Sequence, residues 1–206
     1  MKQLFLCSYF AGVKKLFSDY AKEKNLENKV LFISTAGNKE DYTAYIDEAQ
    51  QTFRDLGFEI EVLDIASCDR ETAQAKIFQS KILYISGGNT FYLLQELKKK
   101  QLLSLIKEQI RDGLVYVGES AGAIITAKDI DYNKLMDDKT VATELYDTAG
   151  LDEVDFYILP HYGEEPFTDS SKKTFEMYKK QLELLPLHNR QAIIINDEQI
   201  DILTIE

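Results

Sequence analysis

Ser120 lies at the centre of the pentapeptide 118–122, GESAG, directly after the apolar run 114–117. The pattern G-x-S-x-G between a strand and a helix is typical of a nucleophile elbow, a sharp turn that projects the serine hydroxyl from the strand end. The flanking glycines relieve crowding where the turn brings chain segments together. The same residues also suit an ordinary strand-to-helix turn, so the interpretation depends on partners elsewhere in the chain.

A serine hydroxyl needs a general base within hydrogen-bond reach, and the chain holds two histidines, His161 and His188. His161 follows the apolar run 156–159 and one proline, so we expect it at the carboxyl edge of the sheet, beside Ser120. His188 precedes a strand that begins near Gln191, and we expect it at the opposite edge. The sequence therefore favours His161 as the base and leaves His188 as the alternative.

The base of such a site needs a carboxylate that fixes its tautomer. Spacing alone does not choose among the acidic residues between Ser120 and His161, which are Asp129, Asp131, Asp137, Asp138, Glu144, Asp147, Asp152, Glu153 and Asp155. Because the whole chain is acidic, we expect most of them to be solvated surface charges.

Backbone N–H groups must stabilise the oxyanion of a tetrahedral intermediate. One candidate donor is Ala121, the residue after the serine. The loop 85–90, ISGGNT, offers another, because its two glycines let the backbone approach a ligand and a helix begins after it. Asn89 and Thr90 of this loop are candidate substrate contacts. The glycine pair would also suit a phosphate, but the loop lacks the lysine and the glycine spacing of phosphate-binding motifs.

The composition indicates an acidic protein with a substantial apolar core. The net charge is −11, and 45% of the 206 residues are hydrophobic. An acidic surface repels nucleic-acid phosphates and anionic lipid headgroups, so we expect neither nucleic acid nor membrane as a partner. No apolar run approaches the ~18 residues of a membrane span. The first apolar segment is too short for a signal sequence, and Cys7 and Cys68 are expected to be reduced thiols in a cytoplasmic protein.

Short apolar segments alternate with longer amphipathic ones along the chain. The expected strands are 4–7, 30–33, 60–63, 82–85, 114–117, 156–159 and 192–195. Most are continuously apolar, which is typical of parallel strands covered on both faces. Apolar residues at helical spacing predict helices over 43–56, 91–99, 102–111 and 168–184.

This alternation predicts an α/β fold, a three-layer sandwich with a mostly parallel sheet. The polar stretch 196–199 between the strand 192–195 and the apolar run 200–205 predicts a closing antiparallel hairpin. No repeat or linker divides the chain, so residues 1–206 are expected to form one catalytic domain. Loops that follow parallel strands gather at one sheet edge, which is expected to collect the loops 34–38, 87–90, 118–122 and 160–163.

Three ordered motifs resemble the peptidase E family of serine peptidases, which includes aspartyl dipeptidase and, more distantly, cyanophycinase. They are Gly87-Gly88-Asn89-Thr90-Phe91 followed by Leu93-Leu94, Gly118-x-Ser120-Ala121-Gly122-Ala123, and Pro160-His161-Tyr162. The resemblance implies a fold similar to that of class I glutamine amidotransferases. It also implies dipeptidase-like hydrolysis of small peptides. No metal or organic cofactor is expected, because no histidine, cysteine or carboxylate cluster has ligand spacing.

The resemblance also implies a role for individual residues. Ser120 matches the nucleophile, His161 the base, and Gly88 and Ala121 the oxyanion donors. The acidic member of the family's triad lies some way after the serine. Asp138 or Asp137 is therefore expected to complete a Ser-His-Asp triad, with no choice between the two.

Two departures from the family pattern concern specificity. Aspartyl dipeptidases place an arginine after the histidine motif, and the matching stretch 163–173 has none. Lys172 would substitute only as a point charge, without the planar fork with which arginine pairs with a carboxylate. Glu119, beside the nucleophile, is either a surface charge or a contact for an amine or a basic side chain of the substrate. Both departures place aspartyl specificity in doubt.

The expected function is therefore that of a serine-type peptidase acting on small peptides as a monomer or homodimer. One alternative is an ester or amide hydrolase of α/β-hydrolase type that uses His188, although the chain lacks the HGGG-type loop of that class. Another is a binding or sensor domain that keeps the fold without activity. A binding domain would need neither Ser120 nor His161.

Overall fold

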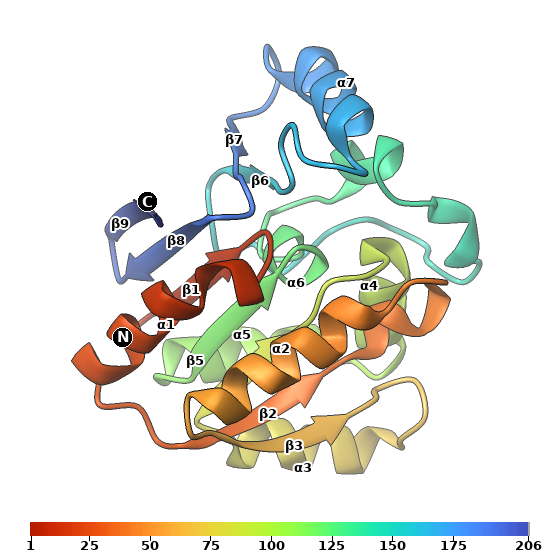
Figure 1. The fold of residues 1–206 in the computed structure, drawn as a ribbon. Helices are drawn as coiled ribbons and strands as arrows, with labels where there is room; N and C mark the ends of the chain where they lie inside the picture. The colour runs from red at the N-terminus through yellow and green to blue at the C-terminus, as the bar shows by residue number, and fades with distance from the viewer. Residues whose placement is uncertain (206) are drawn as a thin grey trace.

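The computed structural model describes residues 1–205, so residue 206, the last of the expected domain, lies outside the described residues. A seven-stranded sheet with the order β3-β2-β4-β5-β1-β8-β9 forms the centre of the molecule (Figure 1). Its strands are β1 (Gln3–Cys7), β2 (Lys29–Ile33), β3 (Glu59–Leu63), β4 (Ile82–Ile85), β5 (Val115–Glu119), β8 (Gln191–Asn196) and β9 (Gln199–Thr204). The first five are parallel, whereas β8 is antiparallel to both β1 and β9. The predicted α/β fold and its closing hairpin are thus confirmed.

Helices cover both faces of the sheet (Figure 1). The helices are α1 (Lys14–Glu23), α2 (Ala44–Asp55), α3 (Arg70–Gln79), α4 (Thr90–Lys99), α5 (Leu103–Arg111), α6 (Ala121–Ile124) and α7 (Thr168–Tyr178). Short 3₁₀ segments are η1 (Ala11–Val13), η2 (Thr35–Lys39), η3 (Asp131–Leu135) and η4 (Lys139–Val141). An aromatic-rich core joins α1 and α2 to one face, and an aliphatic core joins α3 to α6 to the other. On β5, Val117 belongs to the first core and Tyr116 to the second, which explains the continuous apolar runs.

A second, two-stranded parallel sheet lies beside the main sheet and is formed by residues between 157 and 186. It consists of β6 (Tyr157–Leu159) and β7 (Leu184–Pro186), with α7 between them. The sequence predicted a helix over 168–184, but α7 ends at Tyr178. Pro186 cannot continue a helix and disfavours helical backbone before it, and pairing with β6 gives this segment other partners.

Two further differences from prediction concern α1 and α3, which the sequence did not indicate. Helix α3 buries only Ala73 and Ile77, so its apolar stripe is short.

No helix among residues 1–205 is both long and apolar enough to cross a membrane. Cys7 and Cys68 are both free thiols.

The direction of β8 decides where its preceding residues lie. Because β8 is antiparallel to β1, its first residue, Gln191, lies at the edge where the parallel strands end. The expectation that the segment before Gln191 lies at the opposite edge is therefore wrong. His188 and its neighbour Asn189 approach the same edge of the sheet as Ser120.

Candidate active site

Ser120 occupies a tight turn between β5 and α6, with φ +46° and ψ −104°. A positive φ is strained for a residue with a side chain, and such strain persists only where surrounding structure imposes it. Here the imposing contacts are close backbone approaches. A Cβ atom on Gly118 would lie 2.6 Å from the carbonyl oxygen of Gly122, and one on Gly122 would lie 2.2 Å from that of Ile85. The turn therefore has the geometry of a nucleophile elbow.

His161 lies next to this serine, with its Nε2 atom 3.0 Å from the Ser120 Oγ atom. Its backbone N–H donates to the Ser8 hydroxyl at 3.2 Å, and that hydroxyl donates to the Leu187 carbonyl at 2.8 Å. The ring of Phe167 stacks on the imidazole, with 4.9 Å between centroids and 22° between planes. These contacts fix both the position and the plane of the histidine ring.

The other ring nitrogen of His161 faces Asn189, with 2.7 Å between Nδ1 and the amide Oδ1. An amide oxygen only accepts hydrogen bonds, so Nδ1 carries the proton and Nε2 presents its lone pair to the serine hydroxyl. The expectation that Asp137 or Asp138 orients the ring is corrected by this contact. Asn189 is neither a carboxylate nor located between Ser120 and His161, and the segment that contains it lies at the sheet edge opposite to the expected one.

The two aspartates hold a different part of the structure. Asp137 accepts the backbone N–H of Thr90 and the side-chain amide of Asn133, both at 2.8 Å. Burial raises the pKa of Asp137 to about 6. Asp138 caps η4 by accepting the N–H and hydroxyl of Thr140. Asp137 thus ties the segment after α6 to the start of α4, and Asp138 stabilises a local turn.

Two backbone N–H groups near the serine are available to an oxyanion. Within residues 1–205, the N–H groups of Gly88 and Ala121 have no hydrogen-bond partner, whereas the N–H of Asn89 donates to a carbonyl at 2.9 Å. A Cβ atom on Gly87 would lie 3.3 Å from the Ser120 Cβ atom, so this loop passes directly beside the serine. The structure thus brings both predicted donor segments to Ser120.

The side chains predicted to contact substrate are otherwise engaged. Asn89 accepts the Tyr92 N–H and donates to the Asp138 carbonyl, both at 2.9 Å. The Thr90 hydroxyl accepts from the Asn133 amide at 3.2 Å. Both side chains are buried and hold the loop rather than face a substrate. Lys172 is exposed on α7, and its side chain makes no hydrogen bond or ion pair within residues 1–205.

Glu119 lies behind the turn rather than on the surface, and only 2% of it is exposed. Its Oε1 atom accepts the Phe10 N–H at 2.7 Å. Its Oε2 atom accepts the Tyr84 hydroxyl at 2.5 Å and the Gly87 N–H at 3.4 Å. Burial raises the pKa of this carboxyl to about 7. The expectation that Glu119 is a surface charge or touches substrate is therefore wrong.

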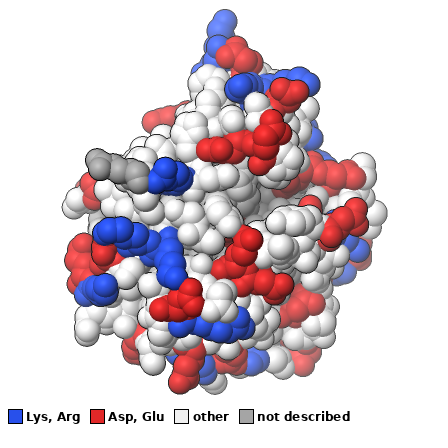
Figure 2. All heavy atoms as spheres, in the orientation of Figure 1, with Lys and Arg blue, Asp and Glu red and all other residues white. Residues whose placement is uncertain are grey.

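The charged groups that act on the site are acidic. Burial lowers the pKa of His161 below 6.5, while the hydrogen bond to Asn189 and the charge of Glu164 act in the opposite direction. Burial, and then the charges of Glu40 and Glu119, raise the pKa of the Tyr45 hydroxyl. Figure 2 shows acidic side chains around a hollow whose walls are otherwise mostly uncharged. No group of three or more histidine, cysteine or acidic side chains among residues 1–205 is arranged to hold a metal ion.

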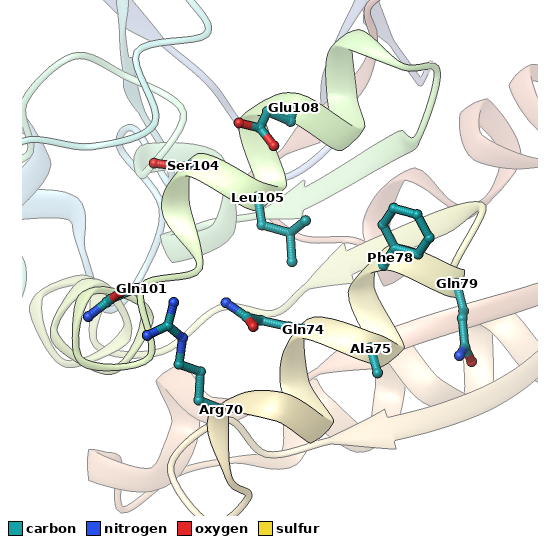
Figure 3. Close-up of a pocket in the computed structure, with 9 residues that line it drawn as sticks. All are labelled: Arg70, Gln74, Ala75, Phe78, Gln79, Gln101, Ser104, Leu105 and Glu108. Carbon is teal, nitrogen blue, oxygen red and sulfur yellow. The ribbon is translucent and has the colours of Figure 1, made fainter.

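A separate cavity of about 620 Å³ lies between α3 and α5. Figure 3 shows Arg70 and Phe78 on one side of it and Leu105 and Glu108 on the other. None of the residues that line it belongs to the serine site. It therefore has no part in the chemistry described below.

Replacing Asn189 by aspartate is expected to raise the pKa of His161, because a carboxylate within hydrogen-bond distance favours the imidazolium. Hydrolysis requires the neutral imidazole, so kcat/KM should rise with pH through a midpoint below 6.5 in the native protein. In Asn189→Asp this midpoint should move upward by about 1–3 units. The measurement is the pH profile of kcat/KM; an unmoved midpoint would show that residue 189 does not act on the base.

A serine on a strained strand-to-helix turn, with a histidine at its hydroxyl and free N–H groups beside it, is the arrangement of a serine hydrolase. The family follows from comparison with known proteins. The family model described as peptidase family S51 matches residues 6–203. The chain belongs to this family and is a serine-type peptidase.

Individual relatives support the same family. The chain is 43% identical over 199 residues to an uncharacterized peptidase of Pasteurella multocida (strain Pm70), covering 96% of this chain and 95% of that protein. It is 34% identical over 134 residues to peptidase E of Shewanella denitrificans (strain OS217), covering 65% and 54%. A crystal structure of a Listeria monocytogenes EGD-e protein, provisionally named as a peptidase E, superimposes with a TM-score of 0.94 at 37% identity and covers all of both chains. The resemblance to peptidase E is confirmed.

Proposed function

We propose that the protein hydrolyses small peptides through Ser120, His161 and Asn189. The observation that carries this proposal is the continuous row of contacts from the Ser120 hydroxyl through both nitrogens of His161 to the Asn189 amide oxygen, at 3.0 and 2.7 Å. The row joins a nucleophile, a base and a group that fixes the tautomer of the base. These are the three roles that acyl transfer by a serine requires.

In the proposed reaction, the Ser120 oxygen attacks the carbonyl carbon of the scissile bond while His161 Nε2 takes the hydroxyl proton. The negative charge on the carbonyl oxygen is stabilised by the N–H groups of Gly88 and Ala121. His161 then gives the proton to the leaving amine, and the C–N bond breaks. Water repeats the sequence on the acyl-enzyme, with His161 as base and then as acid, which releases the second product and restores Ser120.

An amide in the third position has an electrostatic consequence. Asn189 orients the ring, but it offers no net charge to the imidazolium that forms during the reaction, unlike a carboxylate. The charge of Glu164 acts on His161 and opposes the lowering of the ring's pKa by burial. We propose that Glu164 supplies part of the stabilisation that a third-position carboxylate would give.

We also propose that the substrate does not carry an amino-terminal aspartate. The loop 86–89 between β4 and α4, here called the oxyanion loop, passes beside Tyr45, whose ring lies 3.5 Å from the Cβ position of Gly87. The charges that act on the Tyr45 hydroxyl are all carboxylates. These carboxylates would repel the side-chain carboxylate of an amino-terminal aspartate in the substrate, whereas they would attract the substrate's free α-ammonium group. On matched dipeptides, kcat/KM for Asp-X should be at least about tenfold lower than for Ala-X. A preference for Asp-X would contradict this specificity and leave the peptidase assignment intact.

A serine-directed fluorophosphonate tests the proposed reaction. The probe should form one adduct, and peptide mapping by mass spectrometry should place it on Ser120. The adduct should be absent in Ser120→Ala, provided that this variant keeps the native melting temperature. Failure of the native protein to react, together with no hydrolysis of any dipeptide tested, would favour the binding-domain alternative.

A further inference from the structure

We propose that Glu119 is a positioning residue for the oxyanion loop: through the Gly87 N–H it aims the N–H of Gly88 at the reacting carbonyl. This inference rests on the proposed function, because it assigns Glu119 a part in the same reaction. It concerns a buried carboxylate whose hydrogen bonds go to Phe10, Tyr84 and Gly87 and not to the Ser120 hydroxyl.

Glu119 joins the ends of three neighbouring strands. It is the last residue of β5, directly before the nucleophile. Its carboxylate accepts hydrogen bonds from the Phe10 N–H in the segment after β1, from the Tyr84 hydroxyl on β4 and from the Gly87 N–H in the loop after β4. Residues 115, 117 and 119 of a strand share one face, so its side chain enters the aromatic core behind the turn.

The oxyanion loop has few other attachments near the serine. The Ser86 N–H donates to the Ile33 carbonyl at 3.0 Å, and the Asn89 N–H donates to the Ala36 carbonyl at 2.9 Å. Between these points lie two glycines, which have no side chains to pack and the widest conformational freedom. Within residues 1–205, the only partner of the Gly87 N–H is Glu119.

The contacts on Gly87 determine the direction of the next N–H group. The Gly87 carbonyl accepts the Ser86 hydroxyl at 2.9 Å, while the Gly87 N–H is held by Glu119. In a trans peptide the carbonyl of one residue and the N–H of the next point in opposite directions. Holding Gly87 on both sides therefore fixes the direction of the Gly88 N–H, which is one of the two free donors beside Ser120.

The chemistry of position 119 agrees with this role. Burying a carboxylate is unfavourable unless donors compensate it, and an apolar side chain would fill the same space without that penalty. An apolar side chain, however, would leave the N–H groups of Phe10 and Gly87 without an acceptor. A carboxylate accepts from all three donors at once, whereas an amide must direct its NH₂ group at one set of them.

Glu119→Gln tests the proposal. The amide oxygen is expected to keep the short contact to Phe10, so its NH₂ group faces the Gly87 N–H and the loop loses its attachment. We expect kcat and the rate of fluorophosphonate labelling to fall by about 10–100-fold, because an oxyanion donor is displaced rather than removed. KM should stay within about threefold, since ground-state contacts are unchanged.

Glu96→Gln is the matched control. Glu96 is a buried glutamate of α4, 5% exposed, that accepts from the Gln95 amide and does not touch the loop. The same chemical change there is expected to alter stability without altering kcat or the labelling rate. If Glu119→Gln does not fold, Glu119→Asp replaces it, because the shorter side chain loses the 3.4 Å contact to Gly87 first.

The outcomes separate this inference from the proposed function. If the native protein is labelled on Ser120 but Glu119→Gln reacts at the native rate, the positioning role is overturned and the peptidase mechanism stands. A lower melting temperature with an unchanged kcat also overturns it, because that result describes a purely structural residue. If the native protein is not labelled at all, the proposed function fails, and this inference fails with it.

Discussion

His161→Ala is expected to lower kcat for dipeptide hydrolysis by about 10⁵–10⁶-fold, and Ser120→Ala by about the same factor. The two side chains act as one unit, since the serine is a poor nucleophile without a base and the base has no other proton to move. The double variant should therefore be no slower than either single variant. The measurement is kcat/KM of all three variants on one dipeptide, with melting temperatures as the test of folding.

His188→Ala is the matched control for this experiment. His188 is the other histidine of the chain, its side chain is 52% exposed, and its nearest acidic partner is Glu164 at 3.7 Å. Because it does not contact Ser120, its removal should change kcat by no more than about threefold. An activity of His161→Ala close to native, with loss of activity in His188→Ala, would identify His188 as the base instead.

Gly88→Ala is expected to lower kcat by about 10²–10³-fold and to destabilise the fold by about 2–4 kcal/mol. Gly88 has a φ of +125°, which side-chain-bearing residues rarely adopt. An added Cβ atom would lie 2.4 Å from the Ala36 carbonyl carbon and 2.6 Å from the Gly37 nitrogen. Both atoms belong to the backbone, so the loop itself must move, and the Gly88 N–H moves with it.

Gly113→Ala separates backbone strain from this collision. Gly113 has a φ of +100°, but nothing lies within 4 Å of an added Cβ atom there. The substitution should destabilise the protein by about 1–2 kcal/mol and leave kcat unchanged. Chemical denaturation and steady-state kinetics on both variants provide the comparison. Native kcat in Gly88→Ala would exclude its N–H as an oxyanion donor.

The sequence was sufficient to predict the elements whose residues carry one consistent signal. The runs 82–85 and 192–195 are apolar on both faces because helices cover both sides of the sheet, and such strands are recognisable without a structure. The segment 184–186 was not recognisable, because its leucines also fit the end of a helix. Its pairing with β6 is a tertiary interaction that local pattern does not encode.

The same distinction applies to the site. The rule for parallel sheets placed His161 beside Ser120, as the structure does, although His161 follows β6, which belongs to the two-stranded sheet and not to the main sheet that contains β5. Asn189 required the direction of β8, which depends on pairing with β1 across most of the chain. The burial of Glu119 had a usable signal, because the residues before it on β5, 115–118, are buried on both faces of the strand. An acidic residue that continues a strand covered on both faces is expected to be buried and to accept hydrogen bonds from internal donors.

The antiparallel direction of β8 also affects when, during synthesis of the chain, the candidate active site can be completed. Asn189, whose amide oxygen faces the ring of the base, is synthesised after both Ser120 and His161. A chain still emerging from the ribosome holds the serine and the histidine without that third group or the strand behind it. The row of contacts from Ser120 through His161 to Asn189 is therefore complete only after β8 has been synthesised and has paired with β1.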